Sequence, residues 1–199
     1  MQLSKLVVIR TFLVVISLIF TAVTSAEGEK LKANEVVPVI DGEVFDRIVV
    51  IKGETRDSSQ IIKYIRSTEE LKSWTKQVVY TRLNEAEIKT AGEYAAALVR
   101  ALQQVSPGAK YKASASEDGK VVLLDFIVQP RGQNFMELNM YRIEEGTKGV
   151  YSLQMIGRLP TVDNPTAESL APLIKMRQAW MAQTAKFDMS KVKALLDSQ

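Results

Sequence analysis

The sequence predicts an α+β fold in which an antiparallel β-sheet is flanked by helices, an α/β/α sandwich with a long C-terminal helix. Four β-rich segments follow one another between residues 110 and 158, and the short loops between them force neighbouring strands to run antiparallel. Helical patterns come before and after these segments, without the regular alternation of strands and helices that a parallel sheet requires.

The part of the chain before the first helical pattern is expected to be extended. Residues 47–52 and 60–66 are rich in β-branched side chains, and the polar stretch between them contains turn residues, so we expect a β-hairpin. Residues 27–46 mix charged residues with a short apolar stretch at 36–40. We interpret them as an N-terminal arm with one edge strand, because a strand at an edge tolerates Pro38.

Two capping boxes predict the first two helices. Ser67 with Glu70, and Thr90 with Glu93, have the spacing at which a hydroxyl and a carboxylate satisfy each other's backbone donors. The apolar side of the first helix would consist of Leu71, Trp74, Val78 and Val79. The second helix is expected to stop at residues 106–108, Ser-Pro-Gly.

The four later strands are expected at residues 110–116, 120–129, 135–143 and 150–158. Asp118-Gly119 predicts a tight primed turn, because both residues tolerate positive φ. From Met136 to Arg142 the side chains alternate in a way that predicts one buried face and one partly wet face.

The C-terminal part of the chain is expected to be helical. Asn164 can cap a long helix that has Pro165 at its first position, and Asp188 can cap a short final helix. We find no internal repeat and no linker, so we expect one α+β domain at residues 47–199.

The first 26 residues resemble a secretory signal peptide. Lys5 and Arg10 precede an uncharged, mostly apolar run at residues 11–23, which is shorter than the roughly 20 residues that span a bilayer. The run ends in Thr24-Ser25-Ala26, so we expect cleavage after Ala26 and a periplasmic or extracellular location. The alternative is an uncleaved signal anchor in which Arg10 snorkels to the interface.

The composition excludes several function classes. Once Lys5 and Arg10 leave with the leader, 24 basic residues stand against 23 acidic ones, without the basic cluster that a nucleic-acid-binding protein needs. The chain contains no histidine and no cysteine, which rules out Ser-His-Asp and Cys-His catalysis and zinc or copper sites of the usual type. We also find no phosphate-binding loop or calcium loop, and we expect no metal and no cofactor.

Two groups of residues are candidates for a site. The carboxylates Glu137, Glu144, Glu145 and Asp125 lie on or near predicted strands and could supply a glycosidase acid and base. We expect Asp125 to face solvent, because an unpaired carboxylate is costly to bury.

The second candidate is the loop after the strand at 120–129. Arg131, Gln133 and Asn134 offer a guanidinium and two amides on a flexible backbone that could bind a ligand. An ordinary hairpin turn explains the same residue types, and we favour that interpretation.

The segment from Ile61 to Val79 resembles a known family. A hairpin strand such as Ile61–Ile65, followed within ten residues by a helix carrying Trp74, is similar to the Mog1/PsbP-like small exported bacterial proteins. The resemblance covers roughly residues 47–159 and implies an antiparallel sheet sandwiched by helices. The family includes accessory and binding proteins, so the resemblance does not imply an activity.

Together these observations predict an exported, non-enzymatic accessory or binding protein, whose partner is an unknown protein or an apolar ligand. After signal cleavage we expect no stable membrane insertion and no nucleic-acid partner. The alternative is a hydrolase of cell-envelope polysaccharide that depends on carboxylates alone.

Overall fold

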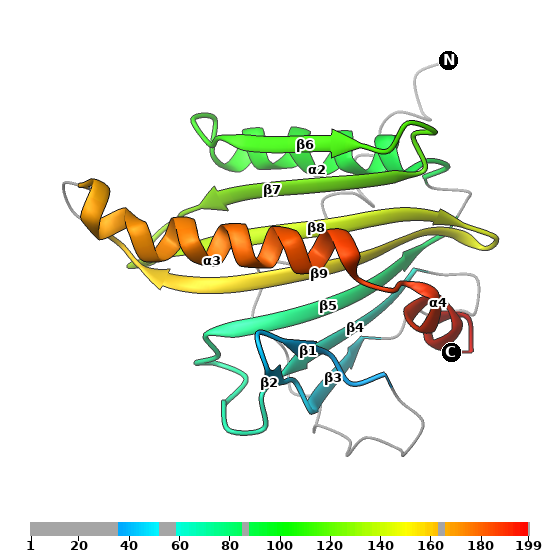
Figure 1. Cartoon of the computed structure of the whole chain (residues 1–199), viewed down its shortest axis with the longest axis horizontal. Coiled ribbons are helices and arrows are strands. Elements are labelled where there is room, and N and C mark those ends of the chain that lie inside the picture. The colour runs from blue at the N-terminus through cyan, green and yellow to red at the C-terminus, as the bar shows by residue number, and fades with distance from the viewer. Residues whose placement is uncertain (1–35, 52–58, 85–87, 163–165, 199) are drawn as a thin grey trace.

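A seven-stranded antiparallel sheet forms the centre of the protein, with strand order β3-β4-β5-β9-β8-β7-β6 (Figure 1). The structure is a computed structural model that describes residues 36–51, 59–84, 88–162 and 166–198. The strands are β3 (Arg47–Ile51), β4 (Gln60–Ile65), β5 (Lys76–Leu83), β6 (Tyr111–Ala115), β7 (Val121–Val128), β8 (Phe135–Gly146) and β9 (Gly149–Pro160). The antiparallel α+β class predicted from the sequence is confirmed.

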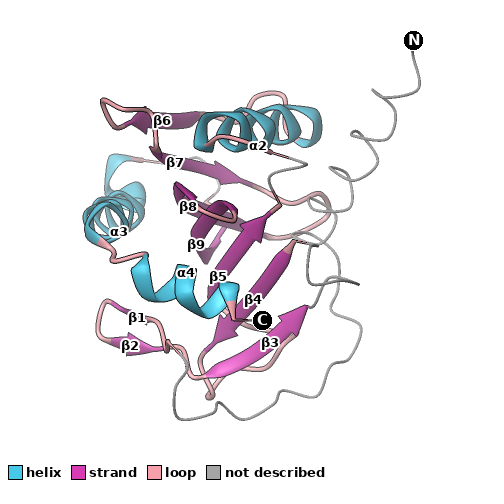
Figure 2. Cartoon of the chain, turned by 90° about the vertical axis from the view of Figure 1, so that its right-hand side faces the viewer, coloured by secondary structure: helices cyan, strands magenta, loops and turns pink. Residues whose placement is uncertain are grey.

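Helices lie on both faces of this sheet. The helices are α2 (Ala91–Val105), α3 (Ala167–Lys186) and α4 (Ser190–Asp197), and a small hairpin is formed by β1 (Val39–Ile40) and β2 (Glu43–Val44). Met140 packs with Trp180 of α3, whereas its neighbour Tyr141 packs with Tyr94 of α2. Because successive strand residues point to opposite faces, α2 covers one face, and α3 and α4 cover the other. We call these the α2 face and the α3 face (Figure 2).

The β3–β4 hairpin, the helix α2 and the four later strands form where the sequence predicts them. Thr90 and Glu93 make the complete capping box at the start of α2. Within the predicted N-terminal arm, Ile40 and Phe45 are buried in the core on the α3 face, so this hairpin packs as part of the folded body. Residues 27–35 of the arm and the predicted signal peptide lie outside the described residues.

The helix predicted at Ser67 is wrong, and strand β5 occupies much of its place. Ser67 donates its N–H to Asp46, 2.8 Å away, and Glu69 binds Arg66 and Thr75, so the capping box is not made. The β-branched Val78 and Val79 pair with β4 and β9 instead. The pairing of β5 with a neighbouring strand on each side stabilises the strand more than a local capping pattern stabilises a helix.

The structure also corrects the predicted turn after β6 and the predicted faces of β8. At the turn after β6, Gly119 has a φ of +71° but Asp118 does not have positive φ, and its carboxylate accepts from the N–H of Lys120. Strand β8 is buried on both faces, since Glu137 and Asn139 are buried as well as their apolar neighbours.

Helix α3 is capped by Thr166 with Ser169, whereas Asn164 and Pro165 lie outside the described residues. Its fully buried positions are Trp180 and Thr184, while the apolar Ile174 is half exposed.

Gly157 of β9 allows α3 to approach the sheet. A Cβ at this position would lie 2.8 Å from an atom of the Trp180 ring, closer than packed carbon atoms allow. We expect Gly157→Ala to displace α3 and to lower the free energy of unfolding by about 1–3 kcal/mol. Chemical denaturation followed by tryptophan fluorescence measures the loss.

Gly108→Ala is the matched control, because no atom of the described residues lies within 4 Å of a Cβ built there. Equal effects of the two substitutions would show that close packing at Gly157 is not the cause.

Candidate functional site

The predicted ligand loop is an exposed hairpin turn. Gly132 has a φ of +75°, and the N–H of Gln133 donates to the carbonyl of Pro130 at 3.1 Å. The backbone carbonyl of Asn134 accepts from the hydroxyl of Thr161 at 3.0 Å. Arg131, Gln133 and Asn134 are therefore neighbours in one turn, and the interactions shown there are those of a strand connection.

The carboxylates considered for catalysis are each engaged separately. Asp125 is only 2 % exposed and forms an ion pair of 2.5 Å with Arg177 of α3, so the expectation that it faces solvent is wrong. Glu144 pairs with Arg142 and Lys193, at 2.6 and 2.8 Å.

Glu145 accepts from the N–H of Ala91 at the start of α2, and Glu137 pairs with Arg158. Asp125 and Glu144 lie on the α3 face, whereas Glu137 and Glu145 lie on the α2 face. On each face the two carboxylates stand four or eight residues apart along the strands, which is about 13 or 26 Å.

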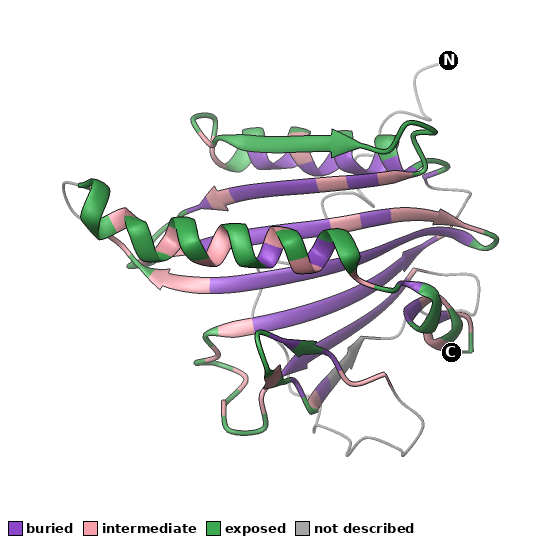
Figure 3. Cartoon of the chain, viewed as in Figure 1, coloured by how far each residue is buried: buried purple, intermediate pink, exposed green. Residues whose placement is uncertain are grey.

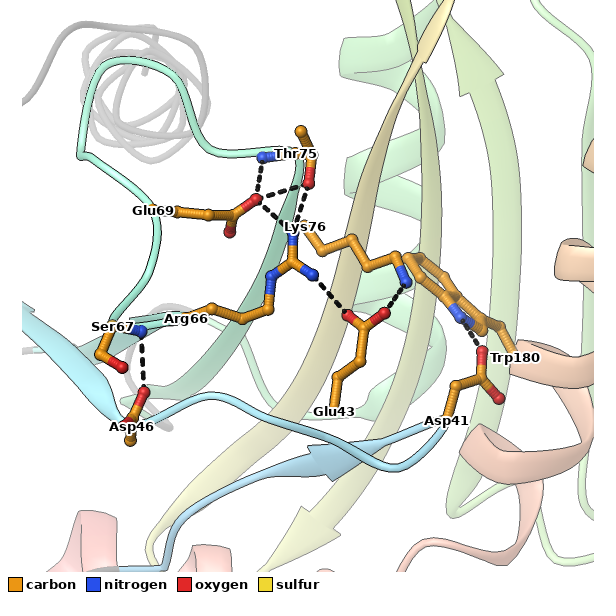
Figure 4. A network of polar contacts seen from close by, with 9 residues as sticks. All are labelled: Asp41, Glu43, Asp46, Arg66, Ser67, Glu69, Thr75, Lys76 and Trp180. Atoms are coloured by element: carbon orange, nitrogen blue, oxygen red, sulfur yellow. Dashed lines mark hydrogen bonds and ion pairs between the residues drawn. The ribbon is translucent and has the colours of Figure 1, made fainter.

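A polar network joins the β1–β2 hairpin to the loop before β5 (Figure 4). Arg66 contacts Glu69 at 2.6 Å and Glu43 at 3.2 Å, and Lys76 reaches the other oxygen of Glu43 at 2.6 Å. Thr75 donates its N–H to Glu69 at 2.8 Å. We call these five residues the hairpin clamp, because they fasten the hairpin to the sheet.

The clamp holds Glu69 as a carboxylate. Partial burial pushes the pKa of Glu69 upward, but hydrogen bonds from Arg66 and Thr75 outweigh burial and lower it to about 2. A group with such a low pKa is a poor proton donor at neutral pH, so the clamp is suited to holding structure together.

The α2 face contains a different kind of feature, a strip of polar side chains across four strands. Residues that lie directly opposite each other on antiparallel neighbouring strands point to the same face. Lys63 of β4 lies opposite Val79 of β5, which in turn lies opposite Gln154 of β9. The neighbouring rows follow the same register. The members, which we call the polar strip, are Lys63, Gln77, Thr81, Glu137, Asn139, Ser152, Gln154 and Arg158. All except the partly exposed Arg158 are buried in the full chain.

The polar strip extends beyond the helix that packs on its face. Helix α2 contacts β6, β7, β8 and β9, and Figure 2 shows it at the β6–β7 end of the sheet, away from β4 and β5. A few apolar side chains, Ile61, Val79 and Ile156, interleave with the strip and form a small cluster with Trp74. The strip is thus polar where the corresponding part of the α3 face is an apolar core.

Hydrogen bonds within the strip fix the orientation of its amides. Gln154 donates to the side-chain oxygen of Asn139 at 2.9 Å, and Asn139 donates to the backbone carbonyl of Glu137 at 3.3 Å. Buried polar groups need such partners, and a connected row is more rigid than separate side chains.

Arg158 ends the strip between two aromatic rings. Its guanidinium carbon lies 3.6 Å from the ring centroid of Trp74 and 4.6 Å from that of Phe135, within the range of cation–π interactions. Its Nε also donates to Glu137 at 3.2 Å. The rings and the carboxylate hold the guanidinium in one orientation.

Burial shifts the ionisation of two strip residues. Burial raises the pKa of Glu137, although Arg158 opposes the shift, and burial lowers the pKa of Lys63. Both shifts mean that burial destabilises the charged form of these side chains. Side chains with shifted pKa values are found at functional sites more often than in ordinary cores.

The strip was not predicted from the sequence. Gln77 and Thr81 lie within or just beside the segment for which the sequence predicts a helix. The signal that reveals the strip is a polar residue at every second or fourth position of several β-rich segments. Glu137 and Asn139, and Ser152 and Gln154, show this spacing of two.

Fold and strip together define an α+β sheet protein with a polar face on four central strands. The chain belongs to a family of uncharacterised proteins, whose model matches residues 50–189. The matched region includes every residue of the polar strip but not Glu43 of the clamp. No curated protein and no solved structure matches the chain.

Within the described residues, no helix has both the length and the apolar character needed to cross a membrane. The same residues contain no group of three acidic side chains placed to hold a metal ion.

The clamp makes a prediction for the pH dependence of stability. Because the pKa of Glu69 is lowered to about 2, its stabilisation is present above the ordinary value of 4.5 and is lost as the pH falls from there to about 2. Glu69→Gln should cost about 1–3 kcal/mol at pH 7 and much less at pH 2. Urea denaturation at the two pH values measures both differences.

Glu70→Gln is the control, because Glu70 is the neighbouring acid outside the clamp. An equal loss of stability at pH 7 and pH 2 for Glu69→Gln would contradict a role for the ionised carboxylate.

Proposed function

We propose that this is an exported, non-enzymatic binding protein, and that the polar strip is its binding surface. The main support is that eight hydrogen-bonding or charged side chains are aligned on the four strands β4, β5, β9 and β8. Burial disfavours the charged forms of Lys63 and Glu137 and so lowers stability. Residues that lower stability in this way are often retained because function needs them.

In the full chain of 199 residues, seven of the eight side chains of the strip are buried and Arg158 is partly exposed. We expect binding by the exported form of the protein, from which the predicted leader has been removed.

The chemistry of the strip favours a polar partner over the apolar ligand considered from the sequence. Amides, hydroxyls and two cations stand there, and the one acid, Glu137, is already paired with Arg158. A protein segment rich in carbonyl and carboxylate groups offers the acceptors that Lys63 and the amides can bind. The resemblance to Mog1/PsbP-like accessory and binding proteins stays a prediction, and the helix carrying Trp74 on which it was based is not formed, because Trp74 lies in the loop before β5.

The polysaccharide hydrolase remains the alternative, but the described carboxylates give it little support. A glycosidase needs two carboxyl groups about 5–10 Å apart, one of which keeps a proton. Glu137 has the raised pKa of an acid, yet Glu145 on the same face lies about 26 Å along the strand. Glu43 and Glu69 share Arg66, but the low pKa of Glu69 disqualifies it as a proton donor.

Binding can be tested on an array of acidic and neutral peptides. We expect protein purified after export to bind acidic peptides, and Lys63→Met and Gln154→Leu to weaken binding about tenfold or more, because each removes hydrogen-bond donors from the strip. Lys175→Met is the control, since Lys175 is an exposed lysine on α3, on the opposite face of the sheet. Binding that is absent, or equal in all variants, would contradict the proposal.

The same lysine variant has a stability signature. Burial makes the pKa of Lys63 lower in the folded protein than the ordinary value of 10.5. Between these two pKa values the unfolded chain binds the proton and the folded protein releases it, so the free energy of unfolding of the wild-type protein should rise with pH in that window. Lys63→Met should show a smaller gain. Reduced binding together with this altered pH profile would separate loss of the ammonium group from general unfolding.

A further inference from the structure

The outer edge of strand β6 is the most exposed regular element of the described chain. All five of its residues are exposed, and Figure 3 shows the strand green along its whole length. Among the described strands, β6 is the last of the sheet and pairs with β7 alone. A strand in this position presents unpaired backbone groups that can pair with another chain.

The register shows which backbone groups point outward. Ser116 donates its N–H to the carbonyl of Val121 at 2.9 Å, so that pair is hydrogen-bonded. Hydrogen-bonded and non-hydrogen-bonded pairs alternate in an antiparallel ladder. The N–H and C=O groups of Tyr111, Ala113 and Ala115 therefore point away from β7, to the open edge.

The usual protections of an edge strand are weak here. The pairing of β6 with β7 is continuous from Tyr111 to Ala115, without a bulge, and the strand contains no proline. Lys112 is its single charged residue, and Ala113, Ser114 and Ala115 are small. Nothing in these side chains prevents the close approach of another strand.

Charges at the two ends of the strand favour one kind of partner. Lys110 and Lys112 lie at its beginning, and Glu117 and Asp118 directly follow its end. In an antiparallel pair of two copies, the basic end of each strand meets the acidic end of the other. A parallel pair would bring like charges together, which is unfavourable.

Apolar surface lies beside the same edge. Tyr111 is 46 % exposed, and Val105, the last residue of α2, is 54 % exposed. Figures 1 and 2 both show α2 running alongside β6, so these side chains enlarge the surface that a second copy can cover. Five backbone-paired residues alone would bury less than a stable interface needs.

We infer that β6 is the interface of a symmetric homodimer, in which the β6 strands of two copies pair antiparallel and join their sheets into one. The two-fold axis passes between the two β6 strands, beside Ala113 of each copy. Such an isologous contact uses the same surface on both copies and closes after two.

Sedimentation velocity of protein purified after export tests this over about 1 to 200 µM. We expect a monomer–dimer equilibrium in the wild-type protein. Ala113→Pro should raise the dissociation constant about tenfold or more, because it removes an outward N–H and leaves the bonds to β7 intact. A monomer over the whole range, or an unchanged dissociation constant in a folded Ala113→Pro variant, would overturn the inference.

A charge exchange provides the second test and does not depend on proline being tolerated. Lys110→Glu should weaken the dimer by about two- to fivefold at low salt, because position 110 lies opposite Ser116 of the second copy and next to its Glu117, so that acids then meet at both ends. Adding Glu117→Lys to the same chain should restore the wild-type dissociation constant. Failure of the double variant to recover would contradict the antiparallel arrangement.

Discussion

The pairing of β8 with β9 is the interaction on which the rest of the structure depends. The two strands are joined by a short turn and pair residue by residue from Gly146 and Gly149 to Phe135 and Pro160. Every other layer attaches to this hairpin, since α3 packs on its one side and α2 on its other. Its residues alternate between the two cores and also supply five of the eight members of the polar strip.

The fold could be predicted wherever a local signal and the tertiary structure agree. Thr90 and Glu93 cap a helix because each side chain accepts from the backbone N–H of the other, and the β-rich segments pair because short turns bring them together. Ser67 shows the opposite case. Its capping pattern is as good in sequence as that of Thr90, but Asp46, Arg66 and Thr75 take up the groups that would have formed the cap.

The candidate site could not be predicted from the sequence, because it depends on register across strands that are distant in the chain. Lys63 and Gln154 are separated by Val79 in the sheet and by more than ninety positions in the sequence. A turn such as Arg131 to Asn134 is visible at once as a cluster, since its members are adjacent. Polar residues that alternate with apolar ones inside strands are easily interpreted as a solvated face, until pairing shows that they form one row.

Dimer formation and the proposed binding function would reinforce each other geometrically. Two sheets joined through antiparallel β6 strands are related by an axis perpendicular to the sheet, so both α2 faces lie on the same side. The polar strips of the two copies then face the same direction, with the two α2 helices between them. A partner with two suitable segments could contact both strips, and the second contact would form at a high effective concentration. Weak binding by a single strip would therefore suffice for stable attachment to an extended or repetitive partner.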